Sequence, residues 1–84
     1  MRFTGKVLRD NRIVPIDGNV SGDIGTFNFN IADAASIWPG PATVITDNSE
    51  TWNINITSTT SSAHVAREQC TFWILGRALR TTPG

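Results

Sequence analysis

Large apolar residues alternate with asparagine in two stretches of the chain, Phe27–Ile31 (Phe-Asn-Phe-Asn-Ile) and Trp52–Ile56 (Trp-Asn-Ile-Asn-Ile). Because successive side chains of a β-strand point to opposite faces, each stretch places rings and branched side chains on one face and amides on the other. The pattern therefore predicts two strands with one buried and one solvent-facing side. We expect Phe27, Phe29 and Trp52 to lie in the core, since a domain this small has few other large residues with which to build one.

The first part of the chain predicts two further strands, Phe3–Leu8 and Arg12–Ile16. Asp10-Asn11 between them is a turn sequence, because both side chains can bond their own backbone. Pro15 lacks a backbone donor, which places the second segment at a sheet edge or at a bulge. Further turns are predicted at Asp17-Gly18 and at Ser21–Asp23, before the strand from Gly25 to Ile31.

The middle of the chain predicts a short helical insert followed by a hairpin. Ile31–Ile37 is alanine-rich and compatible with one or two helical turns. Trp38-Pro39 ends them, because the residue before a proline is pushed out of the α region. Ala42–Thr46 and Thr51–Thr57 are two β-branched runs around the polar turn Asp47–Glu50, which is the clearest hairpin in the sequence.

The last third is more ambiguous. Ser58–Ser62 reads as a hydroxyl-rich loop, and Ala63–Gln69 is compatible either with two helical turns or with the first arm of a closing hairpin. Cys70–Leu79 is largely apolar at both odd and even positions. This pattern predicts a strand buried on two faces, with Gly76 at a bulge or bend. Together, five to seven mostly antiparallel strands with one short helical insert predict a single all-β domain, residues 1–84, folded as a small barrel or sandwich.

A chain of 84 residues buries only a little over ~60% of its unfolded surface, so we expect a thin stability margin. A single cysteine rules out an internal disulfide, and one cysteine with one histidine cannot complete a structural zinc site. We therefore expect stabilisation by association, with itself or with a larger neighbour. The N-terminal region has no secretory signal pattern, and the longest apolar run, Phe72–Leu75, is far short of the roughly 20 residues of a membrane span. These features predict synthesis in the cytoplasm and no membrane contact.

Seven basic and seven acidic residues cancel, which argues against a protein whose main task is to neutralise phosphate. No Lys or Arg lies between Ile13 and Ala66. If the first and last strands lie side by side, as chain ends often do, one flank is basic. The alternative is charge scattered over a solvated surface. The residues predicted to bind a partner are Arg2, Lys6, Arg9, Arg12, Arg77 and Arg80 by charge, and Trp38 as an apolar anchor or as a cap on the end of the barrel.

The sequence contains no recognisable catalytic set. His64 and Cys70 invite a thiolate mechanism, but there is no nucleophile elbow or oxyanion loop, and a buried structural cysteine with a surface histidine is the preferred interpretation. The acidic residues lie at turns, where capping of their own backbone explains them. No phosphate-binding glycine motif occurs. We expect no enzyme activity, no metal and no cofactor.

The overall character is a compact β-domain with an uncharged polar surface, no catalytic set and no export signal. It resembles small accessory proteins of tailed-bacteriophage particles, such as capsid cement or decoration subunits and head-tail joining proteins. The resemblance implies a structural role in a virion, with multivalent, symmetric docking on itself and on a capsid shell. The alternative is a small nucleic-acid-binding barrel of the OB type, with Phe27, Phe29 and Trp52 as a stacking face. A third, weaker possibility is an enzyme subunit or regulator.

Overall fold

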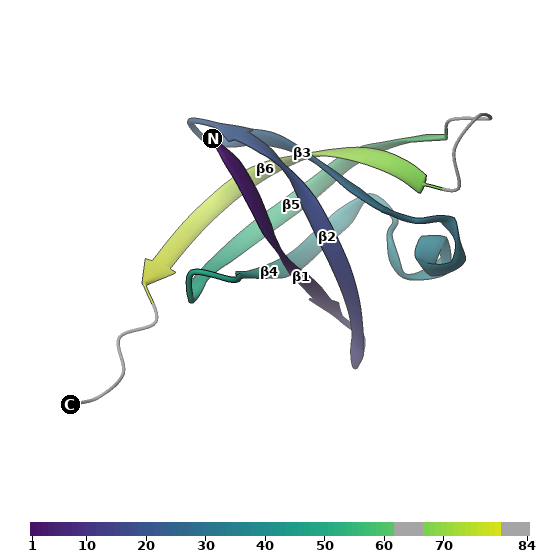
Figure 1. The fold of residues 1–84 in the computed structure, drawn as a ribbon, viewed down its shortest axis with the longest axis horizontal. Helices are drawn as coiled ribbons and strands as arrows, with labels where there is room; N and C mark the ends of the chain where they lie inside the picture. The colour runs from purple at the N-terminus through teal and green to yellow at the C-terminus, as the bar shows by residue number, and fades with distance from the viewer. Residues whose placement is uncertain (62–66, 80–84) are drawn as a thin grey trace.

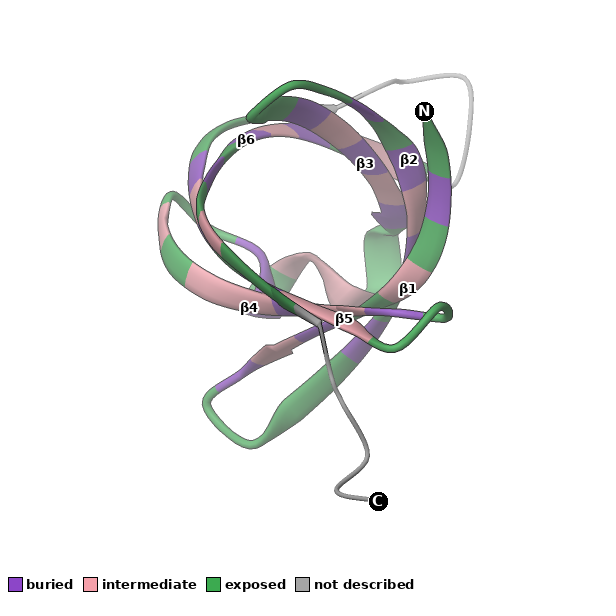
Figure 2. Cartoon of the chain, turned by 90° about the vertical axis from the view of Figure 1, so that its left-hand side faces the viewer, coloured by how far each residue is buried: buried purple, intermediate pink, exposed green. Residues whose placement is uncertain are grey.

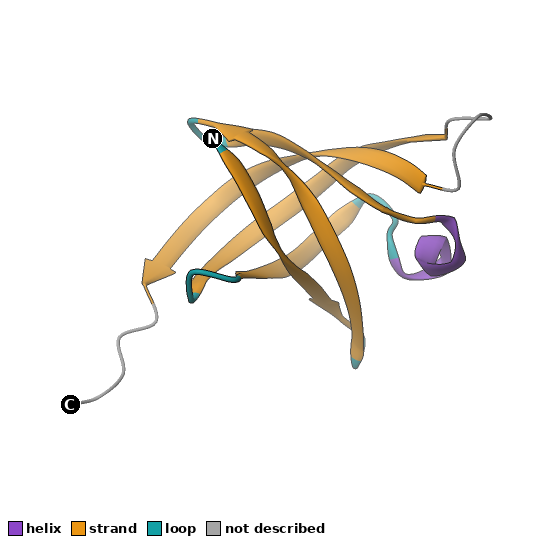
Figure 3. Cartoon of the chain, in the orientation of Figure 1, coloured by secondary structure: helices purple, strands orange, loops and turns teal. Residues whose placement is uncertain are grey.

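The structure is a computed structural model that describes residues 1–61 and 67–79. Six strands form a closed barrel in the order β1-β2-β3-β6-β5-β4, and every neighbouring pair is antiparallel (Figures 1 and 3). The all-β prediction is confirmed, and the architecture is the barrel. The elements are β1 (Arg2–Arg9), β2 (Arg12–Ser21), β3 (Ile24–Asn30), the 3₁₀ helix η1 (Ile31–Ser36), β4 (Gly40–Thr46), β5 (Glu50–Ser61) and β6 (Arg67–Leu79).

The barrel consists of two three-stranded meanders, β1-β2-β3 and β4-β5-β6, joined by the crossover through η1. Two seams close it, where β1 pairs with β4 and β3 pairs with β6. The predicted turn between β1 and β2 is confirmed, with Asp10 at φ 49° and Asn11 at φ 65°. This left-handed conformation is one that Asp and Asn tolerate better than most residues, and it matches the twist of a two-residue hairpin.

The core is built from the inward-facing residues of all six strands, and buried segments alternate with exposed ones around the ring of strands in Figure 2. Phe27, Phe29 and Trp52 are 0% exposed, as predicted. Phe3 meets Trp52 edge-on at a centroid distance of 4.9 Å. The buried apolar residues are Phe3, Val7, Val14, Ile16, Val20, Phe27, Phe29, Ile37, Val44, Trp52, Ile54, Ile56, Cys70, Phe72 and Ile74.

Two predicted loops are strands instead. Asp17-Gly18 lies inside β2 rather than at a turn. A Cβ at Gly18 would come within 2.0 Å of the Thr26 carbonyl oxygen, so this glycine allows two strands to approach closely. Residues 58–61 continue β5, where Ser58 pairs with Thr71. Of the ambiguous segment Ala63–Gln69, residues 67–69 belong to β6 and the others lie outside the described residues.

Pro15 has the edge-like position that its missing donor predicts. It pairs with Lys6 of β1, whereas the pairing of β2 with β3 begins only at Asp17. The side of β2 that faces away from β1 therefore has no ladder at Pro15, and no ladder hydrogen bond is lost there.

The prediction that β6 is buried on two faces is wrong. Cys70, Phe72 and Ile74 point inward, but Trp73 is 47% and Leu75 is 69% exposed. In a barrel wall one face of each strand meets the core and the other faces outward, so a continuous apolar run still has one outer row. The predicted irregularity at Gly76 is confirmed, because a β-bulge precedes it: Ile74 pairs with Ile54 and Gly76 with Asn53, which leaves Leu75 as the extra residue.

Cys70 is 1% exposed, and desolvation raises the pKa of its thiol to about 12, while a backbone hydrogen bond from Phe27 acts in the opposite direction. The folded protein therefore keeps this proton at pH values where the unfolded chain releases it, so the thiol lowers stability as the pH rises from 9.0 toward about 12. His64, the other half of the possible catalytic pair, lies outside the described residues.

We predict that iodoacetamide alkylates Cys70 at pH 8 at least ~100-fold more slowly in the native protein than in the urea-unfolded chain, because a buried protonated thiol is a poor nucleophile. Cys70 is the only cysteine, so the mass of the intact chain reports the reaction directly. Equal rates in the two states would show that the thiol is accessible and contradict a purely structural role.

Candidate interaction site

The predicted basic flank does not form, because the first and last strands are not neighbours. β1 pairs with β2 and β4, whereas β6 pairs with β3 and β5. Two strands therefore separate β1 from β6 in either direction around the barrel. Arg2 and Lys6 are exposed on β1, Arg77 lies on β6, and Arg80 lies outside the described residues. The basic-flank prediction assumed that β1 pairs with β6, but β1 pairs with β4 instead.

Arg9 is buried, at 8% exposure, and is not part of an exposed basic surface. Its guanidinium donates to backbone carbonyl oxygens: Nη1 to Trp38 at 2.7 Å, Nε and Nη2 to Pro41 at 3.1 and 2.7 Å, and Nη1 to Ser36 at 3.5 Å. Desolvation lowers the pKa of this guanidinium from its ordinary value. Arg9 therefore fastens the crossover and the start of β4 to the end of β1.

Trp38 and Arg12 lie beside Arg9 at this end of the barrel. The Arg9 guanidinium carbon is 3.9 Å from the centroid of the Trp38 ring, a cation–π stack, and Trp38 remains 43% exposed. The exposed Arg12 reaches Ser36 Oγ at 3.5 Å. The Trp38 ring covers the Arg9 guanidinium on one side and stays partly exposed, and its roles as a cap on the barrel or as an apolar anchor remain predictions.

Arg77 acts at the opposite end of the barrel. The bulge at Leu75 shifts the phase of β6, so that Arg77 pairs with the buried Trp52, with its guanidinium carbon 5.4 Å from that ring. The guanidinium donates to the Gly22 carbonyl oxygen and lies 3.9 Å from the Asp23 carboxylate. Its charge is therefore engaged within its own molecule.

An apolar patch that the sequence interpretation missed lies on the outer face of β3 and β6. Ile24 (44% exposed) and Trp73 are direct cross-strand partners, and Leu75 follows Trp73 two residues along β6. We call these three residues the β3–β6 patch. A signal was present in the sequence: once Phe72 and Ile74 are placed in the core, Trp73 and Leu75 must point outward.

The cross-strand neighbours of the β3–β6 patch are uncharged. Asn55 pairs with Trp73, Asn53 lies opposite the bulge, and Thr26 pairs with Thr71 on the same outer face. Exposed apolar surface rimmed by polar residues is typical of protein interfaces, and the centres of interfaces are enriched in aromatic residues and depleted of charge. The three patch residues can therefore be covered without burying a charged cross-strand partner, and the ion pair of Arg77 with Asp23 lies at the border of the patch.

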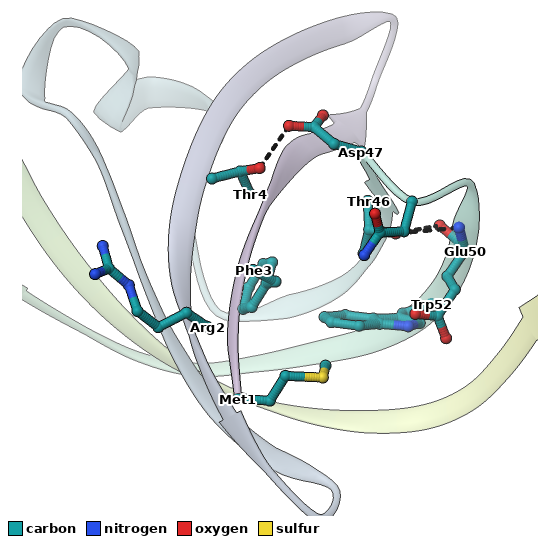
Figure 4. A pocket seen from close by; sticks show the side chains of 9 residues that line it. Met1, Arg2, Phe3, Thr4, Thr46, Asp47, Glu50 and Trp52 are labelled. Carbon is teal, nitrogen blue, oxygen red and sulfur yellow. Dashed lines mark hydrogen bonds between the residues drawn. The ribbon is translucent and has the colours of Figure 1, made fainter.

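A cavity of ≈ 370 Å³ opens at one end of the barrel, where Trp52 forms part of its lining (Figure 4). One wall is the N-terminal part of β1, and the other is the hairpin between β4 and β5. The walls are tied together where Asp47 N donates to the Thr4 carbonyl oxygen at 2.9 Å and Thr4 Oγ1 donates to the Asp47 carboxylate. The lining residues are Met1, Arg2, Phe3, Thr4, Thr46, Asp47, Asn48, Glu50 and Trp52.

Trp52, which lines this cavity, carries an unusual buried group. Its indole Nε1–H is buried and has no hydrogen-bond partner among the described residues. A buried donor without an acceptor typically costs roughly 1–3 kcal/mol, so unsatisfied groups of this kind are rare in folded proteins.

The fold defines a class, a small closed antiparallel β-barrel. In residues 1–61 and 67–79, no group of three or more His, Cys, Asp or Glu side chains is arranged to hold a metal ion, and no helix is long and apolar enough to span a membrane. Comparison with known proteins found no matching family model, no similar curated protein and no similar solved structure.

Proposed function

We propose that this chain is a non-enzymatic structural protein that docks on a larger protein assembly, as a capsid cement, decoration or connector subunit of a virion does. The observation that carries the proposal is the β3–β6 patch, in which Ile24, Trp73 and Leu75 are exposed together among uncharged cross-strand partners. A small subunit with one such patch binds its partner weakly, and the weak contacts would add up where neighbouring subunits are also linked to one another on a symmetric shell.

The nucleic-acid alternative depended on Phe27, Phe29 and Trp52 as a stacking face. All three rings are 0% exposed and pack in the core, so they are not available to stack on bases. The barrel also has six strands rather than the five of an OB-fold. Docking on protein is therefore the function that the described surfaces favour.

The proposal predicts that, in extracts of its natural source, the wild-type chain sediments with a large particle on a density gradient. A double substitution, Trp73→Thr with Leu75→Thr, should move the chain to the slowly sedimenting fractions. Burial of a large apolar side chain contributes about 1.5–3 kcal/mol, so loss of two should weaken each contact by more than ~tenfold. Threonine suits an outward-facing strand position, so the fold should persist.

The matched control is Ile13→Thr, which removes an apolar side chain that is 63% exposed but lies outside the patch. This variant should sediment like the wild type. A wild-type chain found only in the slow fractions would reject the structural role, and co-sedimentation of the double variant would reject the β3–β6 patch as its interface.

A further inference from the structure

The cavity at the end of the barrel lies along an open edge of β1. Met1 exchanges hydrogen bonds with Val20 on the β2 side, at 2.9 and 2.8 Å, whereas the Thr4 carbonyl oxygen accepts from Asp47 on the opposite side. Backbone groups of successive strand residues point to alternate sides. The N–H and C=O of Arg2 therefore point to the same side as those of Thr4, toward the cavity.

No strand of the described chain pairs with Arg2 on that side. The ladder between β1 and β4 begins at Gly5, opposite Thr46, after which the chain turns into β5. The N-terminal part of β1 thus extends past the end of its neighbour, and the cavity occupies the place where β4 would continue. An open ladder beside a cavity is the arrangement that accepts an added strand.

We propose that this cavity binds an extended segment of a partner protein by strand addition to β1. The backbone of the segment would pair with Arg2, and its inward-facing side chains would occupy the cavity that Phe3 and Trp52 line. The inference rests on the proposed function, since it requires a protein partner, and it assigns to that partner a conformation and a second contact apart from the β3–β6 patch.

The facing wall restricts the chemistry of the segment. Asp47 and Glu50 line the cavity from the β4–β5 hairpin, whereas the Arg2 side chain points away from it in Figure 4. Two carboxylates beside the bound strand disfavour acidic side chains by like-charge repulsion. The segment is therefore neutral or basic, and recognition uses the backbone of Arg2 rather than its charge.

Variants at Arg2 separate these two contributions. Arg2→Pro removes the N–H that faces the cavity while leaving the ladder with β2 in place, because proline is tolerated where its missing donor faces an open edge. Arg2→Ala is the matched control, since it removes the charge and keeps the N–H. The probe is a random-peptide library displayed on phage, panned against the wild-type protein, with affinities of the enriched peptides measured by fluorescence anisotropy.

We expect enriched peptides that are poor in Asp and Glu, that bind Arg2→Pro roughly tenfold more weakly than the wild type, and that bind Arg2→Ala within about twofold. On binding, the indole N–H resonance of Trp52 should shift while that of Trp73 stays in place. If Arg2→Pro does not fold, the indole N–H resonances of Trp52 and Trp73 in the wild type still show whether the peptide binds at the cavity. No enrichment, equal binding by Arg2→Pro, or a shift of Trp73 alone would each overturn the inference.

The two proposals fail separately. A chain that sediments with its particle but enriches no peptide loses the strand-addition site and keeps its structural role. A chain that binds peptides through Arg2 and Trp52 but never associates with a particle keeps the site and loses the proposed function.

Discussion

Replacing Arg9 by methionine should lower the free energy of unfolding by about 3 kcal/mol, although methionine has a similar length and is apolar. Three carbonyl oxygens, those of Ser36, Trp38 and Pro41, lose their donor, and Trp38 loses the cation on its inner face. In a domain of this size that loss corresponds to a fall in Tm of roughly 12 °C or more. Urea unfolding followed by tryptophan fluorescence measures it.

Arg9→Lys is the control for charge. Lysine keeps the positive charge but presents a single ammonium in place of the planar fork that reaches both Trp38 and Pro41. Its stability should fall between those of the wild type and Arg9→Met. A change of less than about 0.5 kcal/mol in Arg9→Met, the range of ordinary surface substitutions, would show that the crossover is held without this side chain.

Gly18→Ala should destabilise the barrel by about 3 kcal/mol or more, the upper range for overpacking a well-packed site. The new Cβ would lie 2.0 Å from the Thr26 carbonyl oxygen and 2.7 Å from Phe27 Cα. Both are backbone atoms, so β2 and β3 must separate to relieve the clash. The measurement is again urea unfolding, together with the yield of soluble protein.

Gly76→Ala is the matched glycine control, also in a strand. A Cβ at Gly76 would meet only Asn53 Nδ2, at 4.0 Å. We expect its stability to be unchanged or higher by up to about 1 kcal/mol, through the lower entropy of the unfolded chain. If both glycine variants lose the same stability, backbone flexibility rather than close approach explains Gly18.

The strands could be predicted wherever one face is apolar and the other polar. Phe27–Ile31 and Trp52–Ile56 show this alternation, and their rings lie in the core as expected. Asp17-Gly18 could not be placed from sequence, because a glycine needed for close strand approach looks the same as a glycine needed for a turn. Residues 58–61 could not be assigned from sequence either, because a hydroxyl-rich run is compatible both with a loop and with an exposed strand.

The interaction surfaces were less predictable, because they depend on which strands become neighbours. Arg9 and Arg77 look like free charges in the sequence, yet backbone carbonyls from distant segments take up their donors. The burial of Arg9 follows from the crossover, which no local pattern encodes. The run that contains Trp73 and Leu75 is apolar at both odd and even positions, which predicts burial on two faces, whereas in the barrel wall its odd-numbered positions face outward.

The division into two meanders bears on how the chain finds its fold. Within β1-β2-β3 and within β4-β5-β6 each strand pairs with its neighbour in sequence, whereas both seams join opposite halves of the chain. Pairings of high contact order form slowly, because a long loop must be closed before any contact compensates for its entropy. Pairing at the two seams is thus the slow step of folding. Before it occurs, the edges of β1, β3, β4 and β6 are all unpaired and open to neighbouring molecules.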